Sequence, residues 1–268
     1  MLKHLAIAAA FVAVTAALAI AYTGAPAQDD ALAAFKGNSC VECHSRDLPS
    51  SELSNRYLQW HLSRHMQVGV SCDKCHGGDP KSDNKEKSHK GVLPPAVPIS
   101  LVSPQNVATT CGTCHEAIAE SFSRSTHAIR LKGAGLGPNC TTCHEHMASV
   151  VVTSPTEGAN LCAQCHDAEG GILPKKPQIP VKAKAEMESI ERANNMVIWA
   201  DGLVESAHSK KIDVTAEETA LKSARADLAE AKAIWHDFSL VGVKEKADES
   251  FKKGTIVKDQ LRKKLGFN

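Results

Sequence analysis

The sequence predicts a mainly α-helical protein in two unlike parts: an N-terminal part with little regular structure, then long C-terminal helices. Three observations support this prediction. Aromatic residues make up only 4% of the 268 residues, so few large side chains are present to fill a core. A short cysteine motif recurs between residues 40 and 166. Beyond residue 183 this motif is absent, and apolar residues recur at helical spacing instead.

Residues 1–27 predict a signal peptide. A short basic start precedes an uncharged run at residues 5–21, and Ala25-Pro26-Ala27 supplies the small residues that signal peptidase accepts. The run is short for a membrane span, so we favour cleavage and export to the periplasm or another extracytoplasmic location. An uncleaved anchor formed by residues 5–21 is the alternative. Without residues 1–27 the chain carries equal numbers of basic and acidic residues, which argues against nucleic acid as a partner.

All ten cysteines belong to five copies of one motif, Cys-x-x-Cys-His. Two thiols at this spacing can add to the two vinyl groups of one haem, and the adjoining imidazole can then bind the iron. We therefore expect five haem c groups with their iron. In order, the attachment cysteines and proximal histidines of the five motifs are Cys40, Cys43 and His44; Cys72, Cys75 and His76; Cys111, Cys114 and His115; Cys140, Cys143 and His144; and Cys162, Cys165 and His166.

Structural zinc and disulfides are the competing interpretations of paired cysteines. Zinc sites do not need a histidine directly after the second cysteine, yet one follows in all five motifs. Disulfides within each motif would leave those five histidines unexplained. The repetition therefore favours haem.

The motifs divide the chain into two regions. Residues 28–182 are expected to form a pentahaem-binding region in which stacked haems supply the apolar mass and residues 79–89 and 93–104 are loops. Residues 183–268 are expected to form three helices that pack on the haems. These cover residues 183–210; residues from 215 to about 235, opened by a capping box at Thr215-Ala-Glu-Glu218; and residues 244–265, ending in the basic run Arg262-Lys263-Lys264.

Seven histidines remain as candidate distal ligands once the motif histidines and His4 are set aside. Ser63-Arg64-His65 and Ser125-Thr126-His127 form a partial repeat ahead of a motif, which favours these two histidines. The other expected ligands are a loop histidine and two on C-terminal helices, namely His89, His236 and His208. His61 and His146 are weaker candidates, and Met66 and Met147 are expected to be packing residues.

The ordered motifs resemble the multihaem cytochrome superfamily of pentahaem nitrite reductases, octahaem hydroxylamine oxidoreductases and their tetrahaem electron-transfer partners. The resemblance is carried by Gly69-Val-Ser-Cys72-Asp-Lys-Cys75-His76-Gly-Gly, by Cys111-Gly-Thr-Cys114-His115 with Phe122 and Ser125-Thr-His127, and by the fourth motif with His146. It covers about residues 38–240. The nitrite reductases bind their catalytic haem through Cys-x-x-Cys-Lys, which is absent here, so the resemblance supports the fold more than the catalysis.

We expect an electron carrier whose five haems are mostly closed by two histidines, and we predict no catalytic residue. Its partners would be a redox donor and a redox acceptor, and the oligomeric state is left open. Two alternatives remain at this point. One is a reductase of a nitrogen or sulfur oxyanion with one open haem, and the other is a membrane-anchored quinol dehydrogenase subunit with a quinol-oxidising partner.

Overall fold

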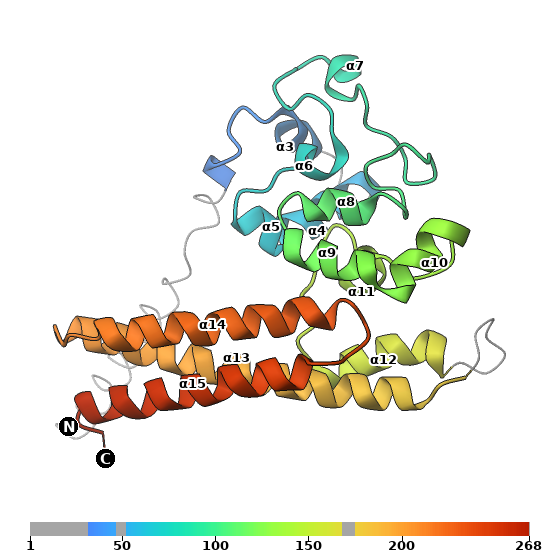
Figure 1. The fold of residues 1–268 in the computed structure, drawn as a ribbon. Helices are drawn as coiled ribbons and strands as arrows, with labels where there is room; N and C mark the ends of the chain where they lie inside the picture. The colour runs from blue at the N-terminus through green and yellow to red at the C-terminus, as the bar shows by residue number, and fades with distance from the viewer. Residues whose placement is uncertain (1–31, 47–51, 168–174, 268) are drawn as a thin grey trace, which may run out of the picture.

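A computed structural model describes residues 32–46, 52–167 and 175–267. This part of the chain is mostly helical and contains no strand, which confirms the predicted fold class (Figure 1). The predicted signal peptide lies outside the described residues. None of the helices in the described ranges has the length and apolar character needed to cross a bilayer. The helices are α3 (Ser39–His44), α4 (Glu52–His61), α5 (Arg64–Gln67), α6 (Asp73–His76), α7 (Lys85–Ser88), α8 (Val107–Gly112), α9 (Glu116–Arg124), α10 (Thr126–Ala134), α11 (Cys140–His144), α12 (Pro155–His166), α13 (Gln178–Ser209), α14 (Thr215–Trp235) and α15 (Val243–Lys264).

The N-terminal region consists of short helices, each begun by a local capping residue where the sequence supplies one. Ser63 caps α5 by accepting a hydrogen bond from the amide of Met66, and Ser125 caps α10 in the same way. This capping explains the Ser-x-His repeat in the sequence. The serine begins a helix, and the histidine two residues later falls in its first turn.

Side chains alone build only a small core in this region. Phe35, Val41, Trp60 and Met66 form one buried cluster, with Met147 packed against it. Val107, Phe122 and Leu131 are buried elsewhere in the region. Other apolar side chains lie exposed, including Leu62 at 63% and Ile99 at 78% of their full accessible area. A region with so few buried side chains needs another source of apolar contact.

The C-terminal helices α13, α14 and α15 lie side by side as a bundle, and α12 lies along α13 (Figure 1). Small residues at the helix contacts let the backbones approach closely, since Ala193, Ala200 and Ala247 are fully buried. Leu221 and Leu261 are also enclosed, and burial of a leucine side chain contributes roughly 1.5–3 kcal/mol. Unlike the N-terminal region, the bundle therefore has an ordinary side-chain core.

Two sequence predictions about the bundle were wrong in detail. Helix α13 begins at Gln178, five residues before the expected start, because Pro180 lies in its first turn, where no backbone donor is needed. The predicted capping box at Thr215 is absent, since the N-cap of α14 is Val214. The carboxylate of Asp213 accepts a hydrogen bond from the Thr215 amide at 3.1 Å instead.

The turn between α14 and α15 joins the bundle to the N-terminal region. Helix α14 contacts α9, and the ring of Phe238 in this turn meets that of Phe122 at 6.3 Å between centroids. This contact brings the end of α14 close to residues that precede the fourth motif.

Candidate haem sites

The five motifs all lie on or beside short helical turns. The first, second, fourth and fifth motif histidines end α3, α6, α11 and α12, whereas His115 of the third motif begins α9. All ten cysteines are free thiols, and the structure joins none of them in a disulfide. Each motif therefore keeps the two thiols and the imidazole that haem attachment requires.

Four of the motif histidines face a second histidine that lies far away in the sequence. We call these the facing pairs. Their ring centroids are 6.0 Å apart for His44 and His89, 6.1 Å for His65 and His115, 5.9 Å for His127 and His166, and 6.1 Å for His144 and His236. In the described residues no group of three or more histidine, cysteine or acidic side chains is arranged to hold a metal ion. The eight histidines of the facing pairs lie in pairs, as expected for the two axial ligands of one iron.

The spacing of the facing pairs fits an iron held between two imidazoles. A histidine–metal bond is roughly 2 Å long and a ring nitrogen lies about 1 Å from its centroid, so two opposed ligands place their centroids about 6 Å apart. The exposed apolar side chains of the region offer surfaces that a porphyrin face would cover. The residues present therefore fit haem c with two histidine ligands.

Backbone hydrogen bonds orient three histidines of these pairs. The Nδ1 atoms of His89, His144 and His236 lie 2.8, 2.9 and 2.7 Å from the carbonyl oxygens of Lys85, Val150 and Lys232. A carbonyl only accepts, so each Nδ1 carries the proton and donates it. The Nε2 lone pair is then free to bind a metal, and the ring orientation is fixed.

Burial keeps several of these rings neutral. It lowers the pKa of His65, and the neighbouring His115 lowers it further. Burial likewise lowers the pKa of His127, with a smaller contribution from His166, and that of His236. Neutral imidazole is the form that binds metal, so the surroundings of these side chains favour ligation at pH 7.

His76 of the second motif differs from the other four motif histidines. Every histidine except His4 is described, and none has a ring contact with His76 in the structure. Burial lowers the pKa of His76, and Arg56 lowers it further. The ring of His61 stacks on that of Tyr57 at 5.8 Å between centroids, and its Nδ1 is buried without a partner. Around His146 the structure gives a backbone contact, in which its carbonyl accepts a hydrogen bond from Ser149 at 2.7 Å.

His208 lies at the end of α13, where its Nε2 is 2.8 Å from a carboxylate oxygen of Glu218. The nitrogen that would bind iron thus pairs with an acid, and no ring contact joins His208 to a motif histidine in the described part of the chain. The two methionines considered as ligands, Met66 and Met147, pack together with the small N-terminal core.

Consecutive motifs are neighbours in space. Burial raises the pKa of Cys72 to about 11, with Cys40 of the first motif adding to the effect. Burial also raises the pKa of Cys75, next to Cys111 and Cys114, and that of Cys143, next to Cys162 and Cys165. A hydrogen bond between Cys111 and Cys140 raises the pKa of Cys111 and links the third motif to the fourth. The five motifs therefore follow one another in space in the order of the sequence.

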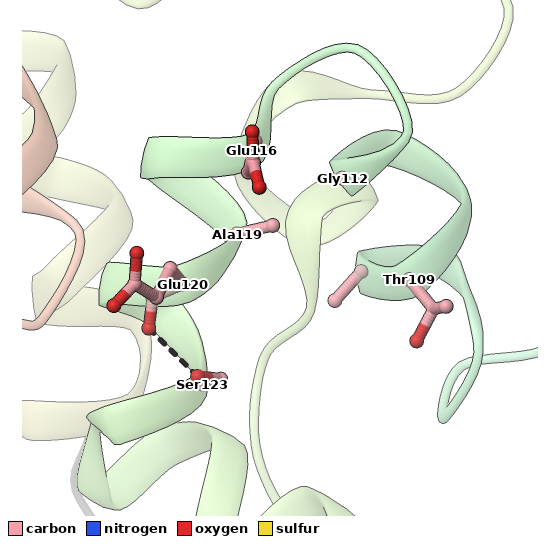
Figure 2. A pocket seen from close by; sticks show the side chains of 7 residues that line it. Thr109, Gly112, Glu116, Ala119, Glu120 and Ser123 are labelled. Atoms are coloured by element: carbon pink, nitrogen blue, oxygen red, sulfur yellow. Dashed lines mark hydrogen bonds between the residues drawn. The ribbon is translucent and has the colours of Figure 1, made fainter.

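A surface groove runs between α8 and α9 beside the third motif (Figure 2). Gly112 faces Ala119 across it, and a Cβ at Gly112 would meet that of Ala119 at 2.9 Å, so glycine within the motif lets the two helices approach. Glu116 and Glu120 also line the groove. Its lining includes Gly112 of the third motif but neither a cysteine nor a histidine.

Two protein families match the chain. The cytochrome c3 family matches residues 64–167, which hold the second to fifth motifs, and the family of cytochrome c554 and c-prime matches residues 17–77, which hold the first two. The finer resemblance to pentahaem nitrite reductases and hydroxylamine oxidoreductases receives no support from these matches. No solved structure matches the chain.

Curated relatives are polyhaem and multihaem cytochromes. The chain is 29% identical over 151 residues to C-type polyheme cytochrome OmcC of Geobacter sulfurreducens, covering 53% of this chain and 17% of that protein. It is 27% identical over 167 residues to OmcB of the same organism, covering 50% and 20%. It is 24% identical over 153 residues to multiheme cytochrome MtrA of Shewanella baltica, covering 54% and 42%. The match thus spans less than half of each of these relatives. Over residues 17–167, which hold all five copies of the repeated motif, the chain is therefore similar to multihaem c-type cytochromes.

Proposed function

We propose that this protein transfers electrons through five covalently attached haems, of which at least four are closed by two histidines. The four facing pairs carry this proposal. A haem closed on both sides exchanges electrons without binding substrate, and the protein's contribution is to fix the ligands, spacing and surroundings of each iron. The relatives, which are named as polyhaem and multihaem cytochromes, support the same function.

The attachment sites define a path through the protein. Haem c supplies one-electron chemistry when it is bound. The contacts between consecutive motifs, from Cys40 beside Cys72 to Cys143 beside Cys162, support an order that follows the sequence from the first motif to the fifth. A donor protein would then meet the chain near one end of this order, and an acceptor near the other.

Export fits this function, because thioether attachment of haem takes place outside the cytoplasm. We propose that residues 1–27 direct export and are then removed. The mature N-terminus should be Gln28, and sequencing of the purified holoprotein would test this. A retained leader would favour the anchored alternative instead.

The proposal is tested by counting low-spin and high-spin ferric haems in the holoprotein with optical and electron paramagnetic resonance spectra. Two axial histidines give a low-spin iron, so at least four of the five haems should be low-spin. Two or more high-spin haems would contradict the assignment of the facing pairs.

A second function is favoured by one observation, the absence of a histidine ring facing His76 within the described residues. If the second motif holds a haem with an open sixth position, this haem could bind and reduce a nitrogen or sulfur oxyanion. The haem of the second motif would then be high-spin, and its spectrum would shift when nitrite or sulfite is added. A low-spin spectrum from all five haems, unchanged by these anions, would exclude this reductase.

A further inference from the structure

We propose that Phe238 is a positioning residue that sets the orientation of the His127 ring, the candidate distal ligand of the fifth motif. The inference rests on the proposed function, because it requires a haem held between His127 and His166. It concerns a residue in the turn after α14, which belongs to none of the motifs.

His127 lacks the hydrogen bond that orients other histidines of the facing pairs. The Nδ1 atoms of His89, His144 and His236 each donate to a backbone carbonyl, whereas Nδ1 of His127 is buried without a partner. The Nδ1 atom of His166 also has no partner. The ring orientation of this pair therefore has to be fixed by packing, whereas hydrogen bonds fix it in His89, His144 and His236.

Phe238 makes the aromatic contact that can do this. Its ring meets the His127 ring edge to face, with centroids 4.7 Å apart and planes 77° apart. Phe238 also contacts the ring of Phe122, with centroids 6.3 Å apart, and Phe122 is itself buried. Edge-to-face contacts prefer a defined geometry, so they restrict rotation of the imidazole.

The backbone conformation of Phe238 indicates that a phenylalanine stands here for its side chain and not for the geometry of the turn. Its φ is +57°, in the left-handed region that a bulky side chain rarely adopts and that glycine adopts readily. A turn selected for its backbone alone would carry glycine there, as it does at Gly242, whose φ is +83°. An aromatic residue in an unfavourable conformation points to a function for its side chain.

The same turn also serves the fourth motif. His236, two residues before Phe238, faces His144. Docking of one turn of the bundle therefore supplies a ligand to the fourth motif and orients a ligand of the fifth.

Replacement of Phe238 by glycine tests the proposal, because glycine relieves the backbone and removes the ring. The g values of a low-spin ferric haem depend on the angle between its two imidazole planes, which is 50° between His127 and His166. His127→Ala first identifies the haem concerned, because one low-spin signal should be lost. Phe238→Gly should shift the g values and the reduction potential of that same signal and leave the others in place. Phe238→Tyr, which keeps the ring, should match the unmodified protein, and so should Phe251→Ala, which removes a phenyl ring from α15.

The outcomes separate this inference from the proposed function. If His127→Ala removes no low-spin signal, the ligand assignment itself fails. If His127→Ala removes the signal but Phe238→Gly leaves it unchanged, the proposed role of Phe238 fails while the ligand assignment stands. The role of Phe238 also fails if Phe238→Gly shifts all signals alike. If Phe238→Gly binds fewer than five haems, Phe238→Leu is used instead, because leucine keeps the apolar bulk without the ring. A shift of the same signal in Phe238→Leu supports the proposal, and an unchanged signal overturns it.

Discussion

Replacing His236 by alanine should open one haem and leave the others closed. His236 is the C-cap of α14, and its ring lies 6.1 Å from that of His144 between centroids. Its Nδ1 donates to the carbonyl oxygen of Lys232, so that Nε2 remains free. Alanine removes the ligand but retains the helical backbone at this position. The lost hydrogen bond costs about 1 kcal/mol, which leaves the core of the bundle intact. One motif of five is affected, so one fifth of the haem should change from low-spin to high-spin.

The assay is spin quantitation of the ferric holoprotein by optical and paramagnetic resonance spectra, with haem content measured in the same sample. His208→Ala is the matched control. It removes a histidine from the end of a neighbouring helix, where Nε2 contacts Glu218 at 2.8 Å. We expect no change in spin state from the control. An unchanged spin count in His236→Ala, or an equal change in both variants, would refute the reasoning.

Two further substitutions test the first haem site and the bundle. Gly78→Ala should also convert one fifth of the haem to high-spin. The φ of Gly78 is +87°, and a Cβ there would clash with the carbonyl oxygen of Ser88 and displace the loop that carries His89. Gly91→Ala has the same φ but open space around it and should leave the spin state unchanged; equal spectra from the two variants would contradict this account. Leu221→Ala should lower the free energy of unfolding by about 2–5 kcal/mol in denaturant titrations, against less than about 0.5 kcal/mol for Ile198→Ala, since Leu221 is 1% exposed and Ile198 60%. Similar losses from both substitutions would show that the bundle core has been misassigned.

Candidate attachment sites can be recognised in the sequence because their chemistry is local. Both thiols and the proximal imidazole of each site lie within five consecutive residues, so no knowledge of the fold is needed to identify them. The helical bundle was also predictable from the periodic apolar residues of α14, of which Leu221, Ala224, Leu228 and Ala231 are buried.

The facing pairs could not be predicted, because they depend on how distant segments meet. His65 precedes the second motif but faces His115 of the third, and His127 precedes the fourth motif but faces His166 of the fifth. The Ser-x-His repeat favoured both histidines as candidate distal ligands. It did not indicate that each would face the histidine of the motif after the nearest one.

Two histidines at helix ends were indistinguishable in the sequence. His208 and His236 both lie near the end of a C-terminal helix, and both were expected to be ligands. In the fold, Glu218 of α14 meets Nε2 of His208, whereas the end of α14 turns toward the fourth motif and brings His236 to His144. Phe238 gave no signal at all in the sequence, since neither its backbone conformation nor its contact with His127 follows from local pattern.

The central claim is that each of the five motifs binds a haem covalently, and intact mass spectrometry of the denatured holoprotein tests it most directly. The protein should be produced in a host that carries out cytochrome c maturation. The account predicts one polypeptide carrying five haem masses, with none of its ten cysteines available to a thiol reagent. A polypeptide without haem, whose cysteines are free, joined in disulfides or bound to zinc, would contradict it.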